Sequence, residues 1–247
     1  MTNVAIIGGS GVYTGLTIIK NCKEEKIKTP YGNVTLKSGL LKDIPVIFLS
    51  RHGSPPVLPH KINYHANIYA LYKKNVTDII ATSAVGSIVK KFKPGTFVIP
   101  DQYIDFSKSI YTFADKSLLS TRHSAHVDMT TPFSKKLAKI LLSAKTVINR
   151  DIYYKATYAG FSGPQFETSA EINMAKQLGA HLVGMTVIPE AKLSRELNVE
   201  YQPLCTVVNY AAGISSEPVT HETTLKIMNE TIKDIEKILE NTITRLY

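Results

Sequence analysis

Cysteine is scarce in this chain, and long apolar runs are missing. Cys22 and Cys205 are its only cysteines among 247 residues, so the sequence offers no disulfide framework. No apolar stretch approaches the roughly 20 residues of a membrane-spanning helix, and no cleavable signal peptide precedes the first apolar segment. We therefore expect a cytoplasmic protein that has no membrane partner.

Acidic residues are outnumbered by basic ones, which leaves a formal net charge of +9. A basic protein can bind nucleic acid, but here the lysines are spread along the chain and no basic run is interleaved with aromatic residues. The alternative is a lysine-rich surface that attracts small anionic substrates. We favour that alternative and expect no nucleic-acid partner.

Several signatures that would assign a function directly are also missing. Gly8-Gly9-Ser10-Gly11 lacks the spacing of a dinucleotide fingerprint, and no P-loop lysine follows it. Gly160-Phe161-Ser162-Gly163 misses the spacing of a nucleophile elbow, which disfavours serine hydrolase chemistry. His123 and His126 could form a pair of metal ligands, but no acidic or cysteine cluster completes a coordination shell. We expect no metal and no organic cofactor.

Apolar runs that read as strands alternate with segments of helical periodicity, and this alternation predicts an α/β fold. The fold should have a mixed or parallel central β-sheet flanked by helices, in one domain spanning residues 1–247. The predicted strands are residues 4–7, 34–38, 46–49, 78–82, 96–99, 153–161, 181–185 and 203–209. The predicted helices are residues 64–74, 133–143, 169–178, 189–197 and a final helix from about residue 218. Residues 105–129 form a long irregular stretch, typical of a lid, a binding loop or an interface.

Three short polar stretches each follow an apolar run of this pattern. They are Gly8-Gly9-Ser10-Gly11, Arg51-His52-Gly53 and Ser83-Ala84-Val85-Gly86. Each is expected at the carboxyl end of a buried strand, which is where open α/β sheets bind their ligands. Together they supply hydroxyls, backbone N–H groups, a guanidinium and an imidazole, which suit an anion such as phosphate. The plainer alternatives are a tight turn for the glycine-rich stretch and a structural salt bridge for Arg51.

These stretches and five more motifs, in order along nearly the whole chain, resemble one known family. The further motifs are Asn63-Tyr64-His65-Ala66-Asn67, the stretch 94–102 (PGTFVIPDQ), Gly163-Pro164-Gln165-Phe166-Glu167-Thr168, the stretch 184–190 (GMTVIPE) and the final helix. The chain is similar to purine nucleoside phosphorylases of the trimeric class, in their methylthioadenosine phosphorylase branch. The resemblance implies a three-layer fold and phosphorolysis of purine nucleosides to a free base and ribose 1-phosphate or its 5-methylthio analogue. Inorganic phosphate would be a co-substrate, and the assembly would be a homotrimer or a dimer of trimers.

The resemblance also implies roles for individual residues. The phosphate ligands would be Ser10, Arg51, His52, Ser83, Ala84 and Thr186. Met185 would lie under the ribose, and Phe166 would stack on the base. His126 would match a residue that a neighbouring subunit lends to the site. His52 and Asn209 would act in the reaction itself, with Asn209 stabilising the leaving base through N7.

The chain departs from methylthioadenosine phosphorylases at positions that read the base. Those enzymes carry Asp at the places of Asn209 and Ala211, and a small hydroxyl residue at the place of Glu167. Asn209 offers a donor and an acceptor at fixed neutral charge, which suits N7 together with O6 of a 6-oxopurine. Glu167 can accept the N1–H of hypoxanthine or guanine, a proton that adenine lacks. Both departures favour a 6-oxopurine such as inosine or guanosine.

The 5′ end of the substrate is less constrained by the sequence. His221 falls near the position that meets the 5′ substituent, where hydroxyl-binding relatives use His and methylthio-specific relatives keep an apolar residue. The alternative for His221 is a solvent-facing residue at the start of a helix. S-methyl-5′-thioinosine or methylthioadenosine phosphorylase is therefore the rival function, and a non-catalytic purine-binding protein is a rival of another class.

Overall fold

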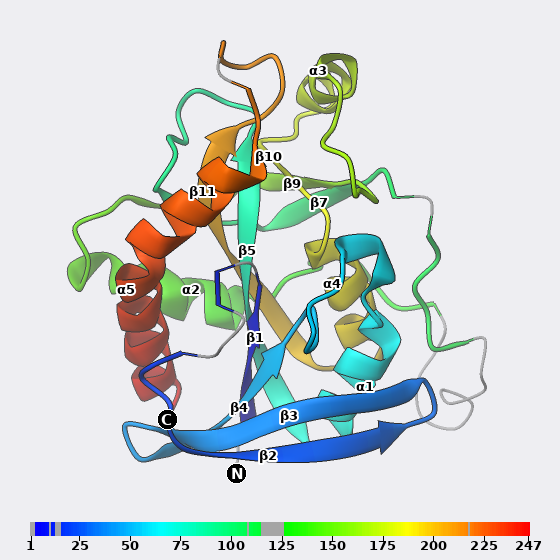
Figure 1. Cartoon of the computed structure of the whole chain (residues 1–247), viewed down its shortest axis with the longest axis vertical. Helices are drawn as coiled ribbons and strands as arrows, with labels where there is room; N and C mark the ends of the chain where they lie inside the picture. Colours follow the sequence, from blue (N-terminus) through cyan, green and yellow to red (C-terminus); the bar gives the residue numbers. More distant parts are fainter. Residues whose placement is uncertain (1–2, 10, 13–15, 108, 115–125, 217) are drawn as a thin grey trace.

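The computed structural model describes residues 3–9, 11–12, 16–107, 109–114, 126–216 and 218–247, so the predictions for Ser10 and His123 lie outside the described residues. Within these ranges eleven strands join one mixed sheet, and Figure 1 shows α2 and α5 on one side of it and α1 and α4 on the other. The strands are β1 (Asn3–Gly8), β2 (Lys20–Thr29), β3 (Gly32–Leu41), β4 (Ile44–Ser50), β5 (Val76–Ser87), β6 (Phe97–Ile99), β7 (Gln102–Asp105), β8 (Ile152–Tyr154), β9 (Thr157–Gly160), β10 (Leu182–Gly184) and β11 (Glu200–Tyr210). The α-helices are α1 (Tyr64–Lys73), α2 (Lys135–Ser143), α3 (Ser169–Gln177), α4 (Val187–Glu196) and α5 (His221–Leu246). This architecture confirms the predicted α/β fold with a mixed central sheet flanked by helices.

The central strand β1 contains a continuous apolar run because both faces of the sheet are covered there. Along β1, Ala5 and Ile7 pack into the core that includes residues of α1 and α4, whereas Val4 and Ile6 pack into the core that includes residues of α2 and α5. All four side chains are buried. A strand between two helical layers therefore reads as a continuous apolar run rather than an alternating one.

Strand β5 changes its partner along one edge, and this change leaves a short part of that edge without a neighbouring strand. Its first half pairs in parallel with β1 as far as Ala81, and its last residues, Gly86 and Ser87, pair antiparallel with β10. The opposite edge of β5 is lined by β11 along almost its whole length. Residues 82–85 consequently lie between the end of the β1 pairing and the start of the β10 pairing.

Several local predictions are confirmed because they rest on capping chemistry. The Asn63 side chain accepts from the Ala66 N–H at the start of α1. Thr168 and Glu171 form a capping box at the start of α3, and Pro189 lies in the first turn of α4. Such bonds join residues three positions apart, so their pattern is visible in the sequence.

Other predictions are wrong. The sequence analysis missed β2 and β7, and it took residues 153–161 as one strand where β8 and β9 are separated at Lys155, which has a positive φ of 67°. Ser83-Ala84-Val85-Gly86 does not follow its strand but lies inside β5, because pairing with β11 and β10 prolongs that strand to Ser87. The final helix starts at His221, three residues after its expected start near residue 218.

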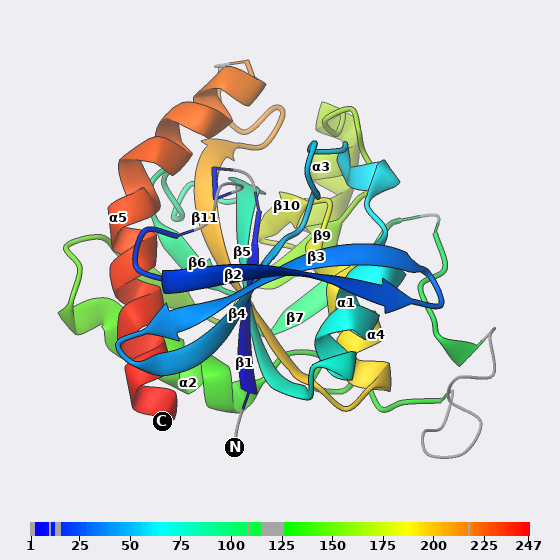
Figure 2. The same ribbon diagram turned by 60° about the horizontal axis from the view of Figure 1, so that its bottom comes forward.

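The hairpin of β2 and β3 forms one margin of the molecule. Figure 2 shows it crossing the view, with α5 on one side of it and α1 and α4 on the other. Most of β2 is exposed and rich in lysine and glutamate, as expected for an edge strand that must not pair with other chains. Among the described residues, no helix is both long enough and apolar enough to span a membrane.

Candidate active site

A cavity of about 560 Å³ lies where β5 changes partners. Its walls come from the end of β4, the second half of β5, the ends of β10 and β11, the loop before α3, and the first residues of α4 and α5. In Figure 1 the ends of β10 and β11 and the start of α5 lie in the upper half of the molecule, away from the two chain termini. A cavity of this size is in the range of small-molecule sites.

Every predicted site residue within the described ranges lines this cavity, with the exception of His126. The lining includes Arg51, His52, Ser83, Ala84, Phe166, Glu167, Met185, Thr186, Asn209, Ala211 and His221. These residues come from segments far apart in the sequence, so the fold brings them together as expected. Their individual roles remain predictions.

Arg51 follows β4 and is almost entirely buried, with 1% of its surface exposed. Its Nε and Nη2 donate to the two carboxylate oxygens of Glu190 on α4, at 2.6 and 2.9 Å. Burial alone lowers the pKa of the Arg51 guanidinium, but the Glu190 carboxylate overrides burial, so the net direction is upward. The alternative expected for Arg51, a structural ion pair, is therefore present, while the residue also lines the cavity.

The other side of the Arg51 guanidinium contacts β5 at Thr82, in the part of the strand that lies between the β1 and β10 pairings. Arg51 Nη1 donates to the Thr82 carbonyl at 2.7 Å, and the Gly9 N–H donates to the Thr82 hydroxyl at 3.1 Å. A Cβ on Gly9 would lie only 2.4 Å from Arg51 Nη1, so this position needs a glycine for the close approach. Since Nη1 and Nη2 each carry two N–H groups, each has one that these bonds do not use.

His52 lies beside Arg51 and is 7% exposed. Its Nδ1 lies 2.8 Å from the Val57 carbonyl, which can only accept, so Nδ1 carries a proton and Nε2 is the nitrogen that titrates. Burial lowers the pKa of His52, the Val57 carbonyl acts in the opposite direction, and the neighbouring Arg51 charge lowers it further. The ring is thus held neutral, with an Nε2 that can accept a proton from a protonated phosphate oxygen.

Glu167 has a carboxylate oxygen that no group in the described chain satisfies. Its Oε1 is buried and has no hydrogen-bond partner among the described residues. Burial raises the pKa of Glu167, and its own backbone N–H partly offsets that rise. An unpaired buried acceptor costs about 1–3 kcal/mol, so its place in a cavity wall indicates that a ligand donor completes it.

Asn209 lies near the end of β11, where the register with β5 shifts between Val207 and Asn209. Such a bulge re-aims the side chains that follow it. Asn209 Nδ2 donates to the Tyr210 carbonyl at 2.7 Å, which fixes the amide plane. Among the described residues, one amide N–H, which can donate to an acceptor such as N7 or O6, and the Oδ1 atom remain for a ligand.

The rest of the cavity wall is largely apolar. Phe166, expected to stack on a base, lines it and is 45% exposed. The segment 56–59 adds another wall, where Val57 and Leu58 are 41% and 58% exposed. From the sequence, this segment was assigned no role, although Pro55 and Pro56 follow Arg51-His52-Gly53 after one serine. Val219 and Thr224, near the start of α5, were also not predicted as site residues.

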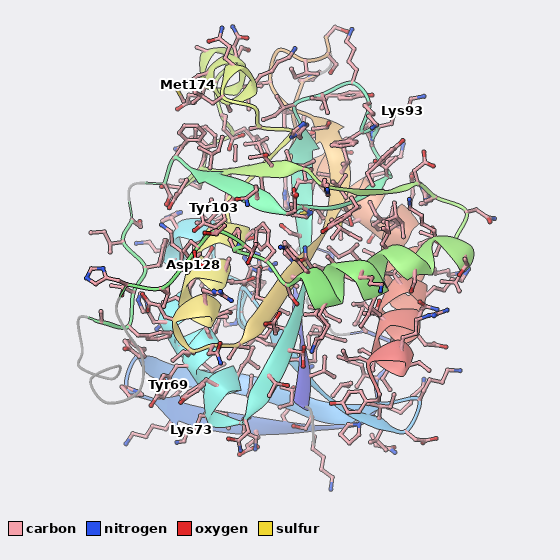
Figure 3. The ribbon with its side chains drawn as sticks, turned by 180° about the vertical axis from the view of Figure 1, so that it is seen from behind. Tyr69, Lys73, Lys93, Tyr103, Asp128 and Met174 are labelled. Carbon is pink, nitrogen blue, oxygen red and sulfur yellow. The ribbon has the colours of Figure 1, made fainter. Side chains whose placement is uncertain are left out.

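His126 is exposed and does not line the cavity of its own chain. Two residues further on, the Asp128 carbonyl accepts from Arg195 Nε at the carboxyl end of α4, and Figure 3 shows Asp128 beside this helix. The cavity lies at the other end of α4, and a helix of ten residues is about 15 Å long. His126 is therefore held well away from the cavity of its own chain.

Among the residues that the structure describes, no three His, Cys, Asp or Glu side chains gather as a metal site would require. His123 is outside those residues, so the expected absence of a metal stays a prediction. Cys205 is fully buried in β11, and burial raises the pKa of its thiol, as expected for an inert side chain.

Known proteins similar to this chain share its full extent. The family described as Phosphorylase superfamily matches residues 3–244. A probable 6-oxopurine nucleoside phosphorylase of Thermococcus kodakarensis is 46% identical over 98% of this chain and 92% of the relative. The 6-oxopurine nucleoside phosphorylase of Pyrococcus furiosus is 45% identical over 97% of this chain and 91% of the relative.

A solved structure has the same fold. The crystal structure of a methylthioadenosine phosphorylase from an antarctic soil metagenomic library superposes with a TM-score of 0.88 at 33% identity. The match covers 99% of this chain and 86% of the other. The matched family, the relatives of similar length and the shared architecture agree, and the chain belongs to the phosphorylase superfamily.

Proposed function

We propose that this protein is a 6-oxopurine nucleoside phosphorylase, which uses inorganic phosphate to cleave the N-glycosidic bond of inosine or guanosine. The observation that carries the proposal is that Glu167, whose buried Oε1 has no hydrogen-bond partner among the described residues, lines the same cavity as Asn209. An acceptor and an amide in one wall suit the N1–H, O6 and N7 atoms of a 6-oxopurine. The names of the relatives at 45–46% identity support the same substrate class.

In this proposal the cavity holds both substrates for an attack of phosphate on C1′ of the ribose. Arg51, Thr186 and Ser83 bind the phosphate oxygens, with Ser10 and Ala84 as further expected ligands. His52 accepts a proton from the phosphate, because its Nε2 is the titrating nitrogen. As the glycosidic bond breaks, negative charge develops on the base, and the Asn209 amide stabilises it at N7.

A comparison of substrates tests the proposal. We expect kcat/KM for inosine and guanosine to exceed that for methylthioadenosine by about a hundredfold or more, because adenine leaves the Glu167 acceptor unpaired. No base should be released without phosphate. Efficient cleavage of methylthioadenosine would contradict the assignment. Purine binding without phosphate-dependent release would instead support the rival of a non-catalytic binding protein.

S-methyl-5′-thioinosine phosphorylase is the second candidate, since the apolar segment 56–59 and Val219 line the cavity beside His221. A thioether would cover this apolar surface, whereas a 5′-hydroxyl would bind His221. Adding S-methyl-5′-thioinosine to the same comparison separates the two. A higher kcat/KM for the thioether than for inosine would identify it as the preferred substrate.

We also propose that the protein is cytoplasmic and assembles as a homotrimer or a dimer of trimers, in which His126 reaches a neighbouring cavity. Its exposure and its distance from its own cavity support this assembly. Analytical ultracentrifugation tests the proposal, and a monomeric mass in solution would contradict it.

The pH dependence of substrate binding follows from Glu167. The ionised carboxylate accepts N1–H more strongly than the protonated carboxyl group does, and burial raises the pKa of Glu167 above the ordinary 4.5. Lowering the pH through that raised pKa should therefore reduce kcat/KM for inosine. In a plot of kcat/KM against pH, the Glu167→Gln variant should lose the inflection caused by Glu167. It should keep the inflection caused by the titration of phosphate itself. Purine riboside, which has no N1–H, is the matched control substrate, and an unchanged profile in the variant would assign the inflection to another group.

A further inference from the structure

Thr186 is the N-cap residue of α4, yet its hydroxyl does not perform the usual capping. Ser and Thr at this position normally accept a hydrogen bond from an N–H of the first helical turn. The Thr186 side chain makes no such bond, although its residue is 8% exposed and lines the cavity. Two features of the chain around it bear on where this hydroxyl lies.

One feature is Pro189, the third residue of α4. The third residue is the most frequent donor to an N-cap side chain, and proline has no N–H to donate. The capping geometry that the Thr186 hydroxyl would otherwise adopt therefore has no donor at that position.

The other feature is Tyr158 on β9, which is fully buried beneath the start of α4. Its hydroxyl oxygen accepts from the Thr186 N–H at 3.3 Å and forms a further hydrogen bond with the Val187 backbone. Burial raises the pKa of Tyr158, so the phenol stays protonated. The hydroxyl thus satisfies, from inside the core, backbone donors that a helix start leaves open.

Gly184 makes this contact possible. A Cβ at Gly184 would lie 2.5 Å from the Tyr158 oxygen, so a side chain there would push the phenol away from the start of α4. Gly184 is paired with Gly160 in the sheet next to Tyr158, which keeps the strand close to the ring.

We propose that Tyr158 is a positioning residue for phosphate: by accepting from the N–H groups of Thr186 and Val187 it holds the backbone at the start of α4, and so fixes where the Thr186 hydroxyl meets the cavity. This inference rests on the proposed function, which identifies the bound anion as phosphate. Tyr158 itself does not line the cavity and contacts no substrate. Its effect on phosphate must therefore pass through Thr186, and that dependence is measurable.

A double-mutant cycle on phosphate binding tests the proposal. The affinity for inorganic phosphate is measured by calorimetry for the wild type, Tyr158→Phe, Thr186→Val and the double variant. We expect Tyr158→Phe to weaken binding about tenfold, as the loss of one hydrogen bond would. In the Thr186→Val background the same change should have little further effect, because the hydroxyl it positions is gone. In turnover, KM for phosphate should rise while KM for the nucleoside stays constant.

Two results would overturn the proposal: wild-type phosphate affinity in Tyr158→Phe, or losses that add in the double variant. If Tyr158→Phe does not fold, Gly184→Ala displaces the same hydroxyl and should weaken phosphate in the same way; unchanged affinity there also overturns it. Tyr153→Phe is the matched control, because this hydroxyl contacts Asp151 outside the cavity. Phosphate binding in this pattern without base release by the wild type would reject the proposed function and retain the role of Tyr158.

Discussion

Replacing Asn209 by alanine should lower kcat for inosine phosphorolysis about a hundredfold, the loss typical when one donor to a developing negative charge is removed. The Asn209 amide is held by its bond to the Tyr210 carbonyl and keeps one N–H for N7 of the base. The charge on N7 is largest in the transition state, so the loss should appear in kcat more than in KM. Steady-state measurement of hypoxanthine release gives both constants.

KM for phosphate should change little in Asn209→Ala, because Arg51, His52 and Thr186 are intact. Asn149→Ala is the matched control, since Asn149 is exposed and does not line the cavity. In contrast, Asn209→Asp should improve cleavage of 6-aminopurine nucleosides relative to inosine, because a carboxylate accepts from the 6-amino group. Unchanged inosine turnover in Asn209→Ala would remove the residue from the mechanism.

The Glu190→Gln substitution should have the largest effect on stability, reducing the free energy of unfolding by about 3–5 kcal/mol. Glu190 is fully buried and accepts from Arg51 twice and from the Tyr201 hydroxyl at 2.7 Å. Glutamine keeps the shape but not the charge, and its amide N–H groups would face the Arg51 donors. The variant leaves a buried guanidinium without its counter-ion, and urea unfolding followed by circular dichroism measures the loss.

Two further variants provide smaller expected losses of unfolding free energy for comparison with Glu190→Gln. Tyr201→Phe removes a single contact to Glu190 and should cost about 1 kcal/mol. Glu24→Gln breaks the exposed pair with Lys37 and should cost less than about 1 kcal/mol. If Glu190→Gln were as stable as Glu24→Gln, the buried ion pair would not be what holds Arg51 beside the cavity.

Sequence reasoning succeeded where the cause of a structure is local. The buried strands β1 and β4 and the caps at Asn63 and Thr168 depend on composition or on bonds across three residues. Strand β2 was missed because its charged, exposed sequence carries almost no apolar signal, and only its pairing with β3 makes it a strand. The position of β2 at the edge of the sheet explains both its charged sequence and why that sequence did not predict a strand.

The candidate site was predicted in part for a related reason. Motifs placed Arg51, Glu167 and Asn209 in one site, because each lies in a recognisable stretch. The partner of Arg51 could not be identified, since Glu190 lies 139 residues away and its carboxylate alone says nothing about which cation it faces. The contact of Tyr158 with the start of α4 is equally hidden, because nothing in the sequence shows which buried hydroxyl accepts from the Thr186 N–H.

The change of partner along β5 also bears on the order in which the protein can fold. β1 and β4 are among the first strands synthesised, whereas β10 and β11, which complete the cavity, come only after residue 181. Until then Arg51 has no Glu190, and residues 82–85 of β5 have no β11 beside them. Contacts over such sequence separations form slowly. The cavity is therefore among the last parts of the molecule to form on the ribosome, and a chain that stops before β11 lacks Asn209 and Ala211 of the cavity wall.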